Sequence, residues 1–97
     1  MPRILIVEDE RVLAKNLREK LSAGGHEVAM VHTAKDAEAM VSAFAPDVII
    51  LDLRLPDGDG LQLLPKLKGE EPSVQAIVMT AHGNERVAVE AMRAGAY

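Results

Sequence analysis

The chain has 97 residues, a formal net charge of −4, 48% apolar residues and no cysteine. This length accommodates one small domain, and the lack of cysteine excludes disulfides and thiolate metal sites. The chain contains no basic block, so we expect no nucleic-acid contact by this domain. No apolar run approaches the roughly 20 residues that cross a bilayer. The N-terminus has no cleavable signal pattern, so we expect no membrane contact and a cytoplasmic location.

The first 25 residues predict a strand and a helix. The apolar run at residues 3–7 is typical of a strand buried on both faces, and it ends directly in acids. The residues after these acids predict a helix that ends at Gly24-Gly25, because glycine accepts the left-handed conformation found there. Leucines recur every four residues on its expected buried face: Leu13, Leu17 and Leu21.

A second strand and a second helix are predicted next, at residues 26–32 and 34–44. Thr33 and Asp36 form a variant of the capping box that opens this helix. Pro46 blocks its continuation. The expected apolar face consists of Ala37, Met40, Val41 and Phe44.

The third apolar run, at residues 48–51, predicts the central strand. It ends abruptly in Asp52, which is followed by a loop that is rich in aspartate and glycine and ends at Gly60. The next segment predicts a helix in which Pro65 introduces a kink unless it lies in the first turn. The expected inward residues of this helix are Leu61, Leu64 and Leu67.

A fourth strand is predicted at residues 74–79, directly before Thr80, and a fourth helix from Asn84 to about Ala94. Strands that alternate with helices predict an α/β fold with a parallel sheet and helices on both faces. Right-handed crossovers leave few topologies. We expect the first and third strands to lie side by side at the centre of the sheet.

The acids that follow these two central strands then converge at one edge, where α/β proteins bind ligands. Glu8, Asp9 and Asp52 offer the oxygen ligands that suit Mg²⁺. An aspartate can also act as a nucleophile toward phosphorus, and the Thr80 hydroxyl can bind a phosphoryl oxygen. The alternative is that each acid only caps a turn or a helix, as Glu8 and Asp9 could do for the first helix.

Four segments resemble the motifs of one family, in its order and spacing. They are LIVEDE at 5–10, DVIILDLRLPDGDG at 47–60, VMTAHG at 78–83 and AMRAGA at 91–96. Over its whole length the sequence resembles the receiver domain of bacterial two-component response regulators. The DLRLPDGDG motif is most similar to the nitrogen-regulator (sigma-54 activator) type, which usually carries an AAA+ ATPase and a DNA-binding module downstream. The resemblance implies a flavodoxin-like three-layer fold with strand order 2-1-3-4.

The resemblance also implies a phosphoacceptor switch rather than a turnover enzyme. Asp52 would take a phosphoryl group from a sensor histidine kinase and regulate a downstream output, such as transcription. Glu8, Asp9, Asp52 and the backbone carbonyl of Arg54 would hold Mg²⁺. Thr80 would bind the phosphate and shift the segment that follows.

One departure from the family concerns the C-terminus. The family has a fifth strand, which ends in a lysine that pairs with the phosphoryl group, and a fifth helix, and both would lie beyond Tyr97. We therefore expect residues 1–97 to be a C-terminally incomplete receiver domain with weaker phosphate stabilisation. The fourth strand would then be an exposed apolar edge that favours self-association.

Two other functions compete with the switch. One is a receiver-like interaction module or fragment that is not phosphorylated. The other is an aspartate-nucleophile phosphatase, but Arg54 stands where such enzymes place a general acid and cannot donate a proton usefully. In the family pattern, Arg54 and His82 would instead tune hydrolysis of the phosphoryl group. His26 and His32 flank a strand and are expected at the surface.

Overall fold

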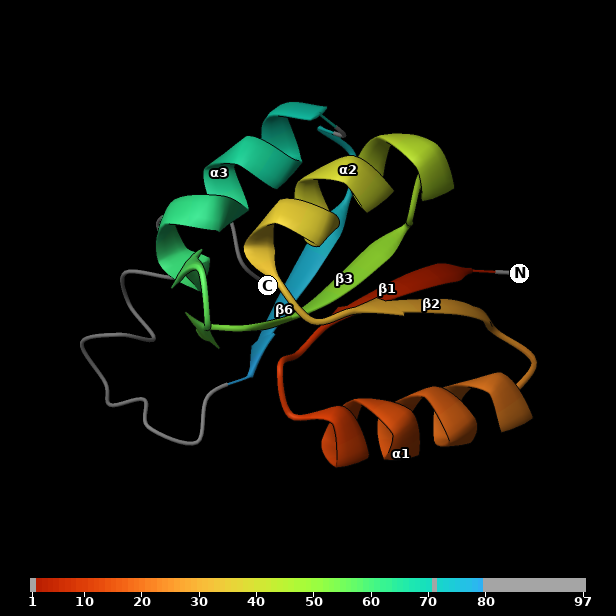
Figure 1. Cartoon of the computed structure of the whole chain (residues 1–97). Helices are drawn as coiled ribbons and strands as arrows, with labels where there is room; N and C mark the ends of the chain where they lie inside the picture. The colour runs from red at the N-terminus through yellow and green to blue at the C-terminus, as the bar shows by residue number, and fades with distance from the viewer. Residues whose placement is uncertain (1, 71, 80–97) are drawn as a thin grey trace.

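The computed structural model describes residues 2–70 and 72–79 as a parallel sheet between two layers of helices (Figure 1). The strands of this sheet are β1 (Arg3–Val7), β2 (Glu27–Val31), β3 (Val48–Asp52) and β6 (Gln75–Met79). The helices are α1 (Arg11–Ala23), α2 (Ala34–Phe44) and α3 (Gly60–Glu70). The strands lie in the order β2-β1-β3-β6, which confirms the predicted order 2-1-3-4.

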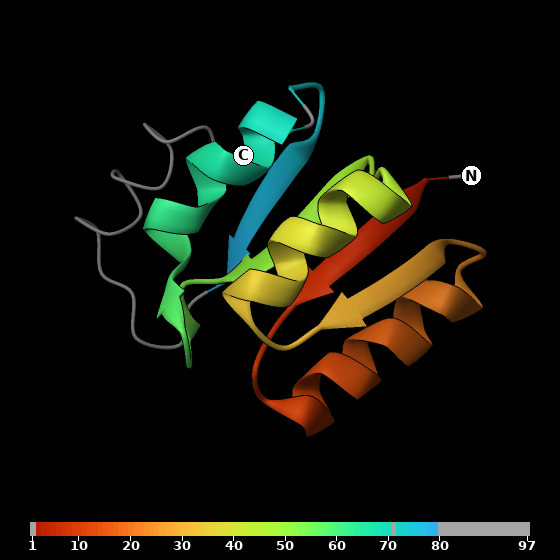
Figure 2. The same ribbon diagram turned by 45° about the horizontal axis from the view of Figure 1, so that its top comes forward.

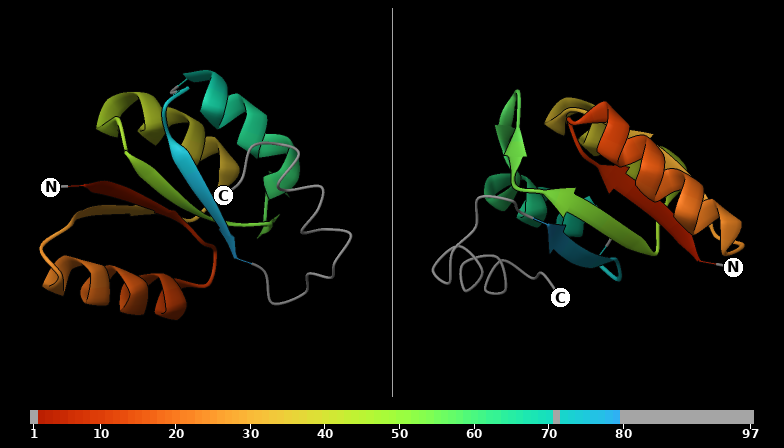
Figure 3. Two further views of the ribbon diagram at one scale, coloured as in Figure 1. Left: turned by 180° about the vertical axis from the view of Figure 1, so that it is seen from behind. Right: turned by 90° about the horizontal axis from the view of Figure 1, so that it is seen from below.

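The core has two parts, one on each face of the sheet. Side chains of β1 alternate between them: Leu5 and Val7 join the cluster under α2 and α3, whereas Ile4 and Ile6 join the cluster under α1. Helices α2 and α3 lie side by side over one face, and α1 covers the other (Figures 2 and 3). All of β1 except Arg3 is buried, as the apolar run predicted.

Helix α1 corrects one detail of the prediction. Leu13 is 40% exposed, and the fully buried residue of this helix is its neighbour Ala14. Leu17 and Leu21 pack against the core as expected. A repeat of four residues drifts around a helix of 3.6 residues per turn, so its first member leaves the buried stripe. The helix ends as predicted, with Gly25 at φ 88°.

Helix α2 begins and ends where it was predicted. The Thr33 hydroxyl accepts a hydrogen bond from the Asp36 amide at 3.1 Å, as an N-cap does. The helix ends at Phe44, and its C-cap residue Ala45 has a left-handed φ of 49° directly before Pro46. The predicted apolar face packs into the core through Ala37, Met40, Val41 and Phe44.

Helix α3 buries Leu64 and Leu67 as predicted, and also Leu63, whereas Leu61 is only half-buried. Pro65 is the sixth residue of this helix and lies past its first turn. Proline has no amide hydrogen, so the Leu61 carbonyl receives no helical bond from it. The helix nevertheless extends to Glu70, and the kink at Pro65 stays a prediction.

The segment between β3 and α3 is more ordered than the predicted loop. Two short strands, β4 (Arg54–Leu55) and β5 (Gly58–Asp59), pair antiparallel around a turn at Pro56 and Asp57. We refer to residues 54–59 as the 54–59 hairpin. The predicted fourth helix, Thr80 and His82 lie outside the described residues.

Candidate functional site: an acidic cluster at the sheet edge

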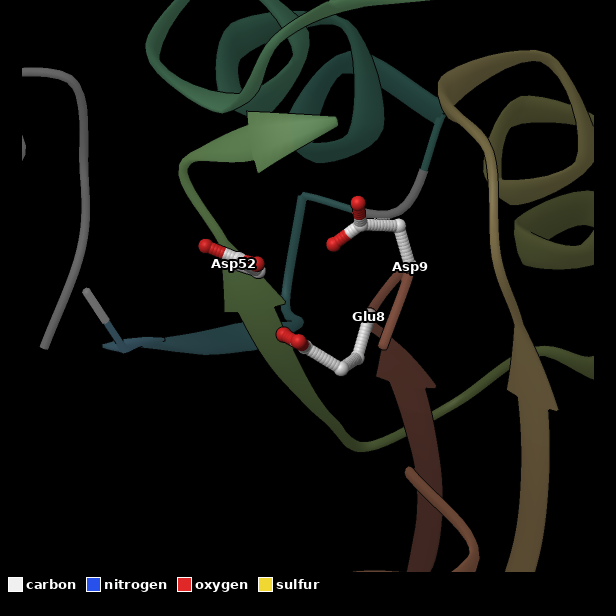
Figure 4. A group of neighbouring side chains, drawn as sticks. All are labelled: Glu8, Asp9 and Asp52. Atoms are coloured by element: carbon white, nitrogen blue, oxygen red, sulfur yellow. The ribbon is translucent and has the colours of Figure 1, made fainter. Parts of the chain in front are cut away.

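The register of the sheet brings the predicted acids together. Val7, the last residue of β1, pairs with Leu51 of β3. Glu8 directly follows Val7, and Asp52 directly follows Leu51, so both acids lie at the same carboxyl edge of neighbouring strands. Figure 4 shows the side chains of Glu8, Asp9 and Asp52 around a common space. This convergence was predicted from the sequence.

The three carboxyl groups differ in their exposure. One oxygen from each of Glu8, Asp9 and Asp52 lies within 4.8 Å of the others. Glu8 is 4% exposed, Asp52 is half-buried and Asp9 is exposed. The cluster is therefore open to solvent on one side.

The burial of Glu8 dominates the electrostatics of the cluster. It raises the pKa of Glu8, because a buried carboxylate loses its hydration. The contact with Asp52 and the negative charges of Asp52 and Asp9 add to this shift, and the net pKa of Glu8 is about 7. The Glu10 amide, which donates to Glu8 Oε1 at 3.3 Å, opposes the shift. Glu8 therefore holds a proton near neutral pH.

These residues fit a hard divalent cation. Carboxyl groups at such separations repel one another when ionised, and a cation among them relieves the repulsion. Oxygen ligands with an open side suit Mg²⁺, which keeps several waters and binds phosphate oxygens. Glu10 is the N-cap residue of α1. The Glu8 carboxyl group thus binds the backbone at the start of α1, in line with the alternative that the acids cap the first helix. That contact does not explain why Asp52 lies in the same cluster.

The 54–59 hairpin folds back onto the end of β3. The Arg54 amide donates to Asp52 Oδ1 at 3.1 Å, and the Gly60 amide donates to the Leu53 carbonyl at 2.9 Å. A Cβ atom at Gly60 would lie 2.7 Å from the Asp52 carbonyl oxygen and 2.8 Å from the Leu53 Cα. Both of these atoms belong to the backbone, so only glycine allows this close approach.

Asp57, at the tip of the hairpin, forms a contact that the sequence did not predict. Its Oδ1 accepts a hydrogen bond from the Ala34 amide at 2.7 Å, and its Oδ2 accepts one from the Lys35 amide at 3.1 Å. These two bonds lower the pKa of Asp57. The aspartate-glycine pattern around Asp57 had indicated only a turn.

His32 also has a role that was missed. It was expected at the surface, but it is half-buried and its Nδ1 donates to the Glu8 backbone carbonyl at 2.8 Å. The Glu8 amide in turn donates to the Val31 carbonyl at 3.1 Å. Both the amide and the carbonyl group of Glu8 are therefore hydrogen-bonded to residues at the end of β2. Register explains the contact, since Val7 pairs with Val31, the residue before His32.

The remaining predicted site residues are placed only in part. Arg54 has an exposed side chain, and its peptide group adjoins Asp52. The β3–β6 register pairs Asp52 with Met79, the residue before Thr80. The roles of Thr80 and His82 stay predictions because both residues lie outside the described ranges. Within those ranges, every helix is too short or too polar to cross a membrane.

Known proteins resemble this chain over nearly its whole length. The transcriptional regulatory protein PhoP of Escherichia coli K12 is 36% identical over 94 residues, which are 97% of this chain and 42% of PhoP. The solution structure of the beryllofluoride-activated NtrC4 receiver domain dimer has a TM-score of 0.93 and 35% identity, covering 100% of this chain and 80% of that one.

A third similar structure is that of a response regulator protein from Burkholderia pseudomallei with a phosphorylated aspartic acid, calcium ion and citrate. Its TM-score is 0.94 at 28% identity, covering 99% of this chain and 56% of that chain. This chain spans less than half the length of the curated PhoP relatives that it matches. The family model of the response regulator receiver domain matches residues 4–97. The chain therefore belongs to the response regulator receiver domain family.

Proposed function

We propose that Asp52 is the phosphoacceptor of a two-component signalling switch, with a sensor histidine kinase as the phosphoryl donor in the cytoplasm. The observation that carries this proposal is the acidic cluster at the carboxyl edge of β1 and β3. Asp52 is its half-buried member, and one of its oxygens already accepts the Arg54 amide. Receiver domains are signalling modules rather than turnover enzymes, and Asp52 would react once per signal.

In the proposed step, an Asp52 carboxylate oxygen attacks the phosphorus of a phosphohistidine. The new O–P bond forms as the N–P bond breaks, and the electron pair of that bond returns to the imidazole nitrogen. Asp52 must be ionised to attack.

Glu8, Asp9 and Asp52, with the backbone carbonyl of Arg54, would hold Mg²⁺ at this site. When bound, the ion supplies positive charge that offsets both the carboxylates and the phosphoryl oxygens. The Burkholderia pseudomallei neighbour contains both a phosphorylated aspartic acid and a calcium ion, which supports a role for a divalent cation in this family.

The proposed readout begins at Thr80. Its hydroxyl would donate to a phosphoryl oxygen, and the segment that follows would shift and alter the binding surface of the domain. The names of the PhoP relatives support a transcriptional output. The DLRLPDGDG motif favours the nitrogen-regulator type, but identity to PhoP and to NtrC4 is nearly the same and does not separate the two.

We also propose that the chain self-associates through the edge of β6, where Ile77 is 45% exposed. The NtrC4 receiver domain, which is a dimer in its activated state, supports association of such domains. This proposal is independent of phosphorylation at Asp52 and has its own test below.

Intact mass after incubation with acetyl phosphate tests the phosphoacceptor. We expect one phosphoryl adduct that requires Mg²⁺ and that is absent in Asp52→Asn. Asp36→Asn is the matched control, because Asp36 is an exposed acid on α2 and should leave the adduct unchanged. A folded wild-type chain that gains no adduct would contradict the proposal and favour a non-phosphorylated interaction module.

A further inference from the structure

The 54–59 hairpin carries a peptide group that touches the phosphoacceptor. The Arg54 amide donates to Asp52 Oδ1, so the position of the hairpin sets one of the hydrogen bonds that orient the Asp52 carboxylate. The hairpin has only two residues in each strand. A two-stranded unit of this size is marginal by itself, so contacts outside the hairpin must fix its position.

Two of these contacts lie in the strands and at the base of the hairpin. Leu55, which pairs with Gly58 beside the turn, is 9% exposed and belongs to the core cluster under α2 and α3. The Gly60 amide donates to the Leu53 carbonyl and closes the base of the hairpin onto β3. Neither contact involves the turn residues Pro56 and Asp57 themselves.

Asp57 holds the tip against α2. Its two carboxylate oxygens accept the amides of Ala34 and Lys35, which are the first two residues of that helix. The first amides of a helix have no partner within the helix, and its N-terminus favours a negative charge. Asp57 is 22 to 23 residues away from these amides in sequence. It therefore ties the turn of the hairpin to the N-terminus of α2.

The N-terminus of α2 has a second cap of a different kind. Thr33 accepts the Asp36 amide from within the same segment and does not involve the hairpin. The helix is thus capped once locally and once from the hairpin. A substitution at Thr33 therefore removes a cap of α2 without touching the hairpin, whereas a substitution at Asp57 affects both.

We propose that Asp57 is a positioning residue for the phosphoacceptor site, acting through the hairpin: its bonds to α2 fix the hairpin tip and so hold the Arg54 peptide group against Asp52. The proposal rests on the assigned role of Asp52. The carboxylate matters because it offers two acceptor oxygens to two amides. An asparagine offers one oxygen and turns an NH₂ group toward the other amide.

Amide hydrogen exchange and Mg²⁺ titration, both followed by NMR on the full chain, test this role with Asp57→Asn and Asp57→Ala. We expect faster exchange at Arg54 as well as at Ala34 and Lys35. We also expect Mg²⁺ to bind about tenfold more weakly, as when support of a metal ligand is lost. Thr33→Ala is the matched control: exchange at Asp36 should rise, while Arg54 and the Mg²⁺ affinity stay at wild-type values.

Three results would overturn the proposal. Asp57→Asn could speed exchange only at Ala34 and Lys35, or leave the Mg²⁺ affinity unchanged, or act no differently from Thr33→Ala at equal loss of stability. If Asp57→Ala unfolds by far-UV circular dichroism, the milder Asp57→Asn decides the question. Failure of the phosphoacceptor assignment would be seen separately. In that case the wild-type chain would gain no adduct from acetyl phosphate, while substitution of Asp57 would still change the exchange rate at Arg54.

Discussion

The carboxyl groups of Glu8 and Asp52 lie beside each other at the ends of the neighbouring strands β1 and β3, with one oxygen of each within 4.8 Å of the other. Two carboxylates this close repel each other when both are ionised, which favours a proton on one of them. Burial of Glu8, together with its contact with Asp52 and the nearby negative charges, raises its pKa from 4.5 to about 7. In the absence of metal, the folded chain therefore retains a proton near neutral pH that the unfolded chain has released.

This relationship predicts that the metal-free chain loses stability as pH rises. Below pH 4.5, Glu8 is protonated in both states and its stabilising contribution is complete. That contribution is lost between pH 4.5 and about 7, where the folded state must accept a buried carboxylate. The loss is on the order of 3 kcal/mol for such a shift. Glu8→Gln should therefore be more stable than wild type at pH 8, and the difference should vanish at low pH.

Urea unfolding at pH 4.5 and pH 8 in the presence of EDTA measures this effect. The matched control is Glu19→Gln, which changes an exposed acid on α1. Its stability should follow that of wild type at both pH values. The interpretation is wrong if Glu8→Gln and Glu19→Gln change stability with pH in the same way.

Metal binding should release the proton that Glu8 holds. A carboxyl group must be ionised to bind a cation, so Mg²⁺ affinity should rise about tenfold between pH 6 and pH 8 for a pKa of about 7. About half a proton should leave per bound ion at pH 7. Titration calorimetry in two buffers of different ionisation enthalpy measures that number. Identical heats in both buffers would show that no proton is displaced.

The two glycines at opposite ends of α3 predict opposite effects of the same substitution. Gly60→Ala would place a Cβ 2.7 Å from the Asp52 carbonyl oxygen, whereas a Cβ at Gly69 would meet nothing within 4 Å. Since the obstacle at Gly60 is backbone, the end of β3 must move, and we expect a loss of about 1–3 kcal/mol in stability. Gly69→Ala should gain up to about 1 kcal/mol through helix propensity.

Thermal unfolding of the two variants decides this comparison, and the Mg²⁺ titration reports on the site. Gly60→Ala should also weaken Mg²⁺ binding, because Asp52 carries the displaced carbonyl. Gly69→Ala should leave the affinity unchanged. Equal melting temperatures for the two variants would contradict the close approach at Gly60.

The fold and the acidic cluster were predictable because both follow from local patterns. Apolar runs that end in acids occur twice, at Val7 and at Leu51, and parallel strands bring such ends to one edge. The error at Leu13 has the same origin, since a repeat of four approximates a helical period but drifts from it. The small residue Ala14 gives no such signal, although it is fully buried.

The contacts made by Asp57 and His32 were not predictable from patterns of that kind. Asp57 reaches amides more than 20 residues earlier in the chain, and its surroundings read as an ordinary turn. His32 lies beside Glu8 only because β2 pairs with β1 in one particular register. Both contacts depend on how elements pack, which a single sequence does not specify residue by residue.

Strand β6 supports a last prediction, that the chain self-associates. Among residues 2–70 and 72–79, β6 has a neighbouring strand on one side only, β3. Ile77 pairs with Ile50, which packs in the cluster under α1, so Ile77 lies on that face of the sheet and is 45% exposed. Exposed apolar edges favour strand pairing, and an edge lysine opposes it. Ile77→Lys should therefore lower the average mass measured by light scattering at high protein concentration.

Val12→Lys is the matched control, because Val12 is 70% exposed on α1 and should leave the association unchanged. A wild-type chain that stays monomeric, or a Val12→Lys variant that dissociates as fully as Ile77→Lys, would exclude the β6 edge as the contact.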